Sequence, residues 1–123
     1  MRLTLIDTGQ PTKVGQPTTL FANLNNTGVS SERQVAVRVL IPNSFTVDRT
    51  AIQPRGSFEV VDVPEGLELR FTPIAELRAG EQQRYIVPLT PARAGVATVS
   101  AQVRSQSATG PTTKQREITI IDR

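Results

Sequence analysis

The chain has 123 residues, which favours one domain, and 14 basic against 11 acidic residues give it a net charge of +3. It contains no cysteine and no histidine, so disulfides, thiolate metal sites and catalytic arrangements built on a histidine base are excluded. The arginines are scattered, and the aromatic residues are four Phe, one Tyr and no Trp. This composition argues against a nucleic-acid surface, which needs a basic stripe with aromatic platforms.

The two ends of the chain both have the pattern of strands, at residues 2–7 and 117–122. The first eleven residues do not have the pattern of a signal peptide. No apolar run reaches the ~18 residues of a membrane span, so no direct membrane insertion is expected. A domain cut from a longer multi-domain chain would begin and end in this way, and we expect an export signal elsewhere in that parent chain.

Between the ends, apolar and polar residues alternate with a period of two, which is typical of half-buried strands. From Leu20 onward the apolar face alternates with Asn23 and Asn25, and Phe21 shares their outward side. The further alternating segments, in chain order, are residues 35–41, 67–71, 84–89 and 97–104. Nine prolines and eight glycines separate these segments and argue against long helices. One short segment, Pro73 to Leu77, is predicted to be a helical turn or a loop that crosses between sheets.

The regular spacing of strands and turns predicts an all-β fold, an immunoglobulin-like antiparallel β-sandwich of about seven or eight strands over residues 1–123. The predicted core is mostly aliphatic, because the aromatic content is low. Such a core can be well packed, since β-branched side chains fit a pleated sheet. Its inner faces are expected to contain Leu3, Leu5, Leu20, Leu24, Val35 to Ile41, Leu69, Phe71, Tyr85 to Leu89, Val99 and Val103.

The order of several short motifs along the chain carries a family resemblance. The motifs are Val14-Gly15-Gln16, Asn26-Thr27-Gly28, Ile41-Pro42, Leu67-x-Leu-x-Phe71, Leu77-Arg78-Ala79-Gly80-Glu81 and Gly95. In this order the chain, from about Leu5 to Ile120, resembles the conserved repeat domain of bacterial surface proteins. It is also similar to the bacterial cell-adhesion-related domain; both are immunoglobulin-like. The resemblance implies a tandem extracytoplasmic module without enzymatic activity and without catalytic residues.

One departure concerns the tyrosine corner of fibronectin-like relatives, in which a Tyr often follows the corner Leu by six residues. Here Gln83 stands six residues after Leu77, and the Tyr comes at position 85. We therefore predict that Tyr85 is an ordinary core residue rather than a corner.

The polar stretch Asn25-Asn26-Thr27 matches the N-x-T acceptor pattern for glycosylation. The favoured interpretation is a connection between sheets, in which Asn adopts special backbone angles and its side chain bonds the local backbone. The seven residues from Asn26 to Glu32 are long enough for that crossing.

Three acidic residues, Asp62, Glu65 and Glu68, flank a Pro-x-Gly turn. They could hold calcium, but they lack the tight spacing of a calcium loop, so solvated charges are the favoured interpretation. Asp7 and Asp122 lie near opposite ends of the chain and are candidates for a junction with a neighbouring module. No glycine-rich phosphate loop and no marked carboxylate pair occurs.

The sequence therefore predicts a non-catalytic structural or adhesive module, with no catalytic, cofactor or metal residues, in a bacterial cell-surface or secreted protein. Its place would be extracellular, at the cell surface or periplasmic. Expected partners are neighbouring domains of the parent chain, or other surface proteins through an edge strand. The alternative is a ligand-binding accessory module for carbohydrate or calcium, for which Phe45 and Phe58 are the aromatics expected to be exposed.

Overall fold

A computed structural model describes residues 2–7, 12–106 and 111–122. Within these ranges the chain forms strands and connections, without helices. The strands are β1 (Arg2–Asp7), β2 (Thr12–Lys13), β3 (Thr18–Asn25), β4 (Glu32–Pro42), β5 (Phe45–Val47), β6 (Phe58–Val63), β7 (Gly66–Phe71), β8 (Ile74–Leu77), β9 (Gln82–Pro91), β10 (Gly95–Arg104) and β11 (Thr112–Ile121).

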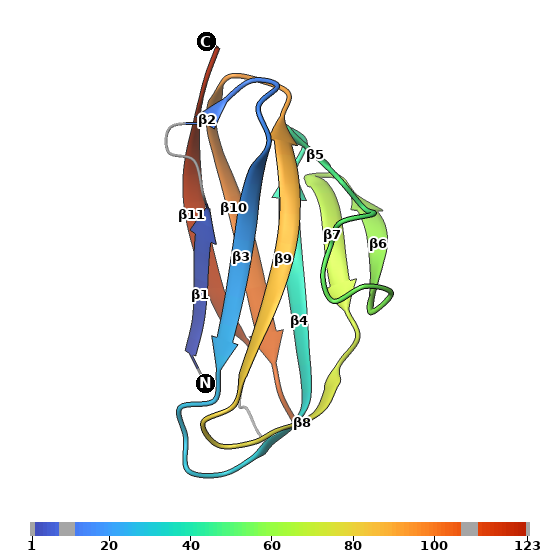
Figure 1. Ribbon diagram of the computed structural model, residues 1–123, viewed down its shortest axis with the longest axis vertical. Helices are drawn as coiled ribbons and strands as arrows, with labels where there is room; N and C mark the ends of the chain where they lie inside the picture. Colours follow the sequence, from blue (N-terminus) through green and yellow to red (C-terminus); the bar gives the residue numbers. More distant parts are fainter. Residues whose placement is uncertain (1, 8–11, 107–110, 123) are drawn as a thin grey trace.

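The strands form two sheets packed face to face (Figure 1). The front sheet has the order β1-β3-β9-β5, and the back sheet has the order β2-β11-β10-β4-β7-β6, with β8 also paired to β4. All pairs are antiparallel except β2 with β11. The predicted immunoglobulin-like sandwich is confirmed. Its strands outnumber the predicted seven or eight, because β2, β5 and β8 are too short to show a period and β6, with the sequence FEVVDV, does not alternate strictly.

The core lies between the sheets and is mostly aliphatic, as the alternation predicts. The predicted inner positions that are buried are Leu3, Leu5, Leu20, Leu24, Val35, Val37, Val39, Ile41, Leu69, Phe71, Tyr85, Val87, Leu89, Val99 and Val103. Phe45 was expected to be exposed, and that expectation is wrong, since only 5% of its surface is accessible. As the first residue of β5, it pairs with Pro91 on the edge of the front sheet and points inward with the core.

The segment Pro73 to Leu77 was predicted to be a helical turn or a crossing loop, and that prediction is wrong. Residues Ile74–Leu77 form β8, which pairs with β4 between Glu32 and Val35. The farther half of the same edge of β4 pairs with β7. The edge of β4 is longer than β7 and offers unpaired backbone groups, so a short extended segment after Pro73 satisfies them better than a single helical turn.

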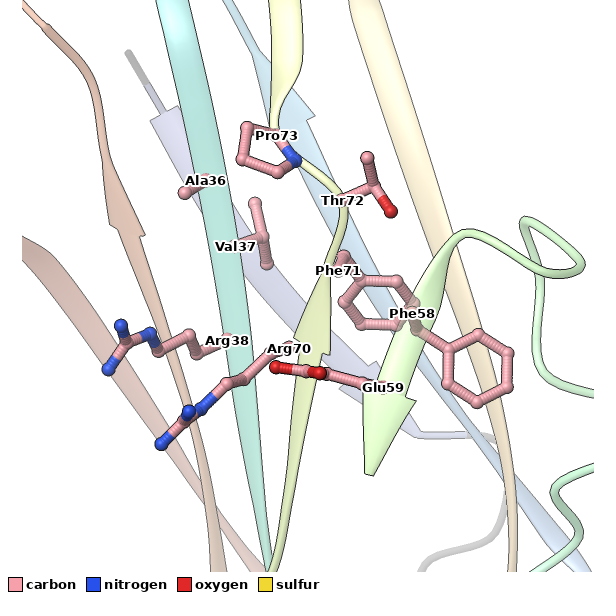
Figure 2. A pocket seen from close by; sticks show the side chains of 9 residues that line it. All are labelled: Ala36, Val37, Arg38, Phe58, Glu59, Arg70, Phe71, Thr72 and Pro73. Carbon is pink, nitrogen blue, oxygen red and sulfur yellow. The ribbon is translucent and has the colours of Figure 1, made fainter. Parts of the chain in front are cut away.

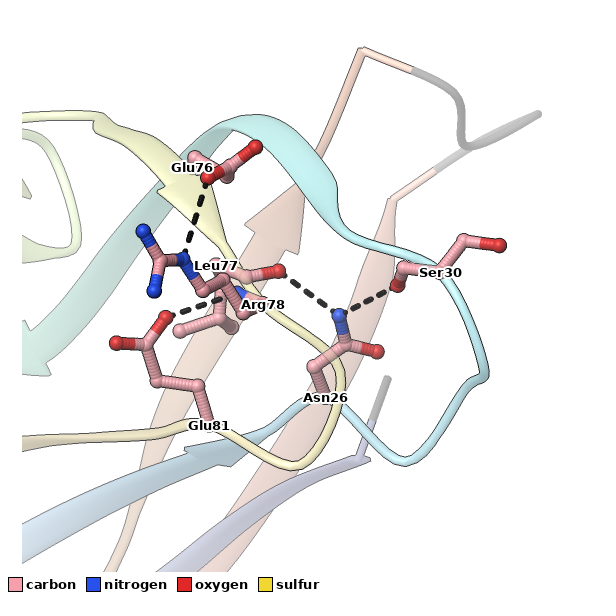
Figure 3. Close-up of polar contacts among 6 residues, drawn as sticks. All are labelled: Asn26, Ser30, Glu76, Leu77, Arg78 and Glu81. Carbon is pink, nitrogen blue, oxygen red and sulfur yellow. Dashed lines mark hydrogen bonds and ion pairs between the residues drawn. The ribbon is translucent and has the colours of Figure 1, made fainter.

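At the lower end of the sandwich, the side chain of Asn26 ties two connections together (Figure 3). Its Nδ2 donates hydrogen bonds to the carbonyls of Ser30 and Leu77, both at 2.9 Å, and its Oδ1 accepts from the Gly28 N–H at 3.1 Å. Its backbone also bonds to Gly80 and Glu81. Asn26 is 2% exposed, so these bonds satisfy polar groups that water does not reach.

At the margin of the core, three aromatic rings form a row from the interior toward the surface. Tyr85 lies 4.4 Å from Phe71, and Phe71 lies 6.1 Å from Phe58, measured between ring centroids, with tilted planes. Tyr85 is buried, and within the described residues its hydroxyl has no hydrogen-bond partner. This burial raises the pKa of Tyr85 to about 12. Tyr85 packs as a core residue, as predicted.

We predict that Asn26→Asp lowers the free energy of unfolding by about 2–4 kcal/mol, because a buried carboxylate cannot donate to the two carbonyls. The introduced carboxyl has a raised pKa in the folded state, so the deficit grows as the pH rises above about 4, where the unfolded carboxyl ionises. Urea unfolding between acidic and neutral pH measures both effects. The exposed Asn43→Ala serves as control, with an expected change within about 0.5 kcal/mol. A pH-independent N26D protein as stable as this control would contradict the assigned role.

We predict that the wild-type protein loses stability as the pH rises from about 10, where the unfolded phenol ionises, to about 12, where the Tyr85 phenol ionises in the folded state. The folded state favours the neutral phenol, so its contribution is complete below the unfolded pKa. Tyr85→Phe should remove this pH dependence, with equal or slightly higher stability at neutral pH, since no hydrogen bond is lost. Chemical unfolding of both proteins across the alkaline range tests this. A Tyr85→Phe protein that is clearly less stable at neutral pH would show that the hydroxyl has a partner.

Candidate interaction surface

The outer face of the front sheet carries two adjacent cross-strand rows of side chains. In the register of β1, β3 and β9, Thr4 lies opposite Asn23, and Asn23 opposite Arg84. Two residues along, the next outward positions of the three strands are all apolar. This apolar row consists of Ile6, Phe21 and Ile86. Ile6 is 49% exposed, and Phe21 and Ile86 are partly exposed, so an apolar stripe crosses a sheet face that faces the viewer in Figure 1.

Arg84 links the two rows. Its Nε donates to Asn23 Oδ1 at 3.0 Å, and its guanidinium carbon lies 5.5 Å from the centroid of the Phe21 ring. A guanidinium over an aromatic face is attracted by the negative face of the ring. Beside it lies a hollow of about 160 Å³, here called the polar hollow, lined by Thr4, Asn23, Asn25, Gln82, Gln83 and Arg84. The face therefore combines hydrogen-bonding groups with an apolar platform.

The charges on this face are not balanced by acidic side chains. Among the described residues of β1, β3, β5 and β9, the charged ones are Arg2, Asp7 and Arg84, and Asp7 points into the protein with a fully buried side chain. The outward charged side chains within these four strands are thus two cations, and the exposed carboxylate of Asp48, directly after β5, accepts hydrogen bonds from Thr50.

A hollow of about 410 Å³ on the back sheet has the opposite character (Figure 2). Arg70 Nε lies 2.6 Å from Glu68 Oε1, and Arg38 lies 3.7 Å from the same oxygen. The hydrogen bond to Glu68 raises the pKa of Arg70, and Glu59 adds to this effect. The cations of this hollow have acidic neighbours, so it presents no uncompensated charge to a ligand.

The three acids considered for calcium are not brought together as a metal site. Glu68 binds the two arginines described above, whereas Asp62 and Glu65 are exposed around the β6–β7 hairpin. In the part of the chain that the structure describes, no three acidic, histidine or cysteine side chains are placed to hold a metal ion. The prediction of solvated charges therefore holds for the exposed Asp62 and Glu65, whereas Glu68 forms ion pairs with two arginines.

The structure also corrects or refines three other expectations. Asp7 is not available for a junction with a neighbour, because its buried carboxylate accepts a hydrogen bond from Arg116 Nε. It alternates inward with Leu3 and Leu5, and Arg116 reaches it from the back sheet. Asp122 is exposed. Phe58 is only partly exposed and packs on Phe71, so no exposed aromatic cluster forms there.

The N-x-T stretch forms the end of β3 and the start of the connection from the front sheet to β4 in the back sheet. This is the predicted crossing. Asn25 lies partly exposed at the end of β3. The side chain of the neighbouring Asn26 is buried and forms the hydrogen bonds that hold the connection.

The apolar row was missed by reasoning from the sequence. One signal was present, since Phe21 shares the outward side of β3 with Asn23 and Asn25. The contributions of Ile6 and Ile86 depend on strand register, which the sequence pattern does not supply.

No helix in the described ranges is long and apolar enough to cross a membrane.

Comparisons with known proteins find similarity in structure only. No protein-family model matches the chain, and no curated protein matches it in sequence. A cohesin module from a Clostridium perfringens family 33 glycoside hydrolase has a TM-score of 0.68 at 15% identity, over 98% of this chain and 96% of that one.

Two structures of a CARDB domain from Pyrococcus furiosus are also similar. The solution structure has a TM-score of 0.61 at 15% identity, covering 97% of this chain and 94% of that one. The crystal structure, in complex with di-metal ions, has a TM-score of 0.62 at 14% identity, covering 98% and 88%. At such low identity the likeness establishes the fold: this chain has the immunoglobulin-like β-sandwich of the CARDB and cohesin modules.

Proposed function

We propose that this domain is a non-catalytic structural module, a spacer that holds neighbouring domains in line within a bacterial cell-surface or secreted protein. The observation that carries this proposal is the placement of the terminal strands. β1 starts in the lower part of the long axis, above the β3–β4 and β8–β9 connections, and β11 finishes toward the upper end (Figure 1). Neighbours attached to the two strands would follow each other along this axis, and the length of the sandwich would separate them.

Tension between the two ends would load the terminal strands along their own direction. β1 pairs with β3 in register from Arg2 to Asp7, and β11 pairs with β10 in register from Thr112 to Ile120. The hydrogen bonds of an antiparallel pair run perpendicular to the strands. A force along the strands therefore strains many bonds at once rather than opening them one after another. This arrangement suits a module that transmits load.

The ion pair between Asp7 and Arg116 joins the two terminal strands across the sheets. Arg116 extends the inward side of β11, on which Ile118 and Ile120 are buried, and its Nε donates to the Asp7 carboxylate. The Asp7 side chain is fully buried, whereas the Arg116 side chain is 37% exposed. Tension would draw β1 and β11 in opposite directions, so this contact would resist their sliding. Breaking a buried pair leaves an uncompensated buried charge.

The comparisons support a modular role, because both kinds of similar structure are described as parts of larger proteins. One is a module of a glycoside hydrolase and the other is a domain of a longer archaeal protein. The calcium alternative receives no support from the described acids, which do not converge.

We predict that Asp7→Asn lowers the force needed to unfold the domain when it is pulled between its two ends. It should also lower the free energy of unfolding by about 2 kcal/mol, because Arg116 loses its charged partner. Single-molecule pulling measures the first quantity and urea unfolding the second.

Asp62→Asn provides the matched control, since it removes an exposed carboxylate from β6, away from the terminal strands. Its unfolding force and its stability should equal those of the wild type. Equal unfolding forces for Asp7→Asn and wild type would refute a load-bearing contact. The wild-type domain should resist pulling between its two ends more strongly than pulling across the sheets. Equal or lower unfolding forces for pulling between the ends would refute the spacer proposal.

A further inference from the structure

We propose that the outer face of the front sheet, with the apolar row and the polar hollow, is a docking surface for an acidic segment of a partner protein. An Asp or Glu side chain of the partner would lie in the polar hollow beside Arg84, and its apolar side chains would lie on Ile6, Phe21 and Ile86. This lateral contact is separate from the in-line role of the terminal strands and does not depend on it.

The positive charge of the face favours a partner with negative charge. Arg84 is held by a neutral amide, Asn23 Oδ1, and by the Phe21 ring. Neither neutralises the guanidinium. On the back sheet, in contrast, Arg38 and Arg70 share Glu68. An incoming carboxylate would supply on the front sheet the charged partner that the chain itself supplies on the back sheet, and such charge-assisted bonds are short and strong.

The size of the hollow selects the kind of ligand. Sites for small molecules usually occupy about 300–1,000 Å³, and the polar hollow measures about 160 Å³. A single acidic side chain fits it better than an oligosaccharide. The hollow also offers amide groups from Asn23, Asn25 and Gln82, which donate to carboxylate oxygens.

The apolar row supplies the other part of a protein interface. Aromatic residues and arginine are enriched where binding energy concentrates in such interfaces, and charged residues are depleted from their centres. Phe21 lies between Ile6 and Ile86 in the register of the three strands and beneath Arg84. The centre of the face thus has the composition that anchors a partner.

A second copy of this chain does not fit the same face. A two-fold contact would bring the face against itself, and Arg2 and Arg84 would then meet the same cations without a carboxylate to balance them. Like charges across an interface disfavour association. The charge pattern therefore favours a different, acidic protein.

The test uses the full chain and a random-peptide display library as the probe. Selected peptides are synthesised, and their affinities are measured for wild type and for two outward variants, Phe21→Thr and Arg84→Gln. We expect the selected peptides to place Asp or Glu beside apolar residues. Each variant should weaken binding by about tenfold or more, as loss of an interface anchor does. Added salt should weaken binding to wild type more than to Arg84→Gln.

Two matched controls come from the outer face of the back sheet, Leu40→Thr and Arg104→Gln. Their affinities for the peptides should stay within about twofold of wild type, since surface changes outside an interface have small effects. Thermal unfolding of all four variants checks that each remains folded.

Three outcomes would overturn the proposal. The first is a selection whose peptides bind equally well to wild type, Phe21→Thr and Arg84→Gln. The second is enrichment of basic peptides. The third outcome uses oligogalacturonate, an acidic oligosaccharide, as the probe. If it shifts nuclear magnetic resonance signals only on this face, and the selected peptides do not compete with it, the face is a saccharide site.

Discussion

The aliphatic core between the two sheets is the constraint on which the rest of the molecule depends. Burial of alternate residues on β3 and β9, such as Leu20, Leu24 and Val87, forces the intervening residues outward, because successive side chains of a strand point to opposite faces. Phe21 and Ile86 therefore face outward and are partly exposed as a consequence of packing elsewhere. A shift of register by one residue would bury Asn23 and Arg84 and expose the core, so the outer face is fixed as firmly as the inner one.

Polar contacts complete the sandwich at places where the aliphatic core ends. Asn26 joins the β3–β4 connection to the carbonyl of Leu77 at the lower end, and Asp7 joins β1 to Arg116 on β11 at one side. The Asn26 amide is retained together with its partners, which avoids the cost of an unsatisfied group, and the buried Asp7 carboxylate keeps a cationic partner. These contacts also specify how the connections and the terminal strands sit relative to the sheets. The two side chains thus act on geometry rather than on chemistry with a ligand.

The surroundings of particular arginines differ between the two faces of the sandwich. The back sheet balances Arg38 and Arg70 with Glu68, whereas the front sheet leaves Arg84 among amides, hydroxyls and apolar groups. The net charge of +3 gives no hint of this difference, because a sum over the chain contains no information on which face a charge occupies. A module that is extended along one axis and carries one uncompensated face suits a structural role combined with lateral recognition.

The sequence by itself determined the fold class, most of the core and the crossing after Asn26, because the period of two and the turn residues are local properties. It also determined that Tyr85 packs in the core, whereas Phe45 and Ile74–Leu77 were predicted wrongly, since short segments carry no readable period. Only the tertiary structure decided which distant residues meet. Strand order and register bring Asp7 to Arg116 and Asn26 to Leu77. They also place Ile6, Phe21 and Ile86 in one row. Strand order and register depend on the packing of the whole sandwich, so no single stretch of the sequence specifies them.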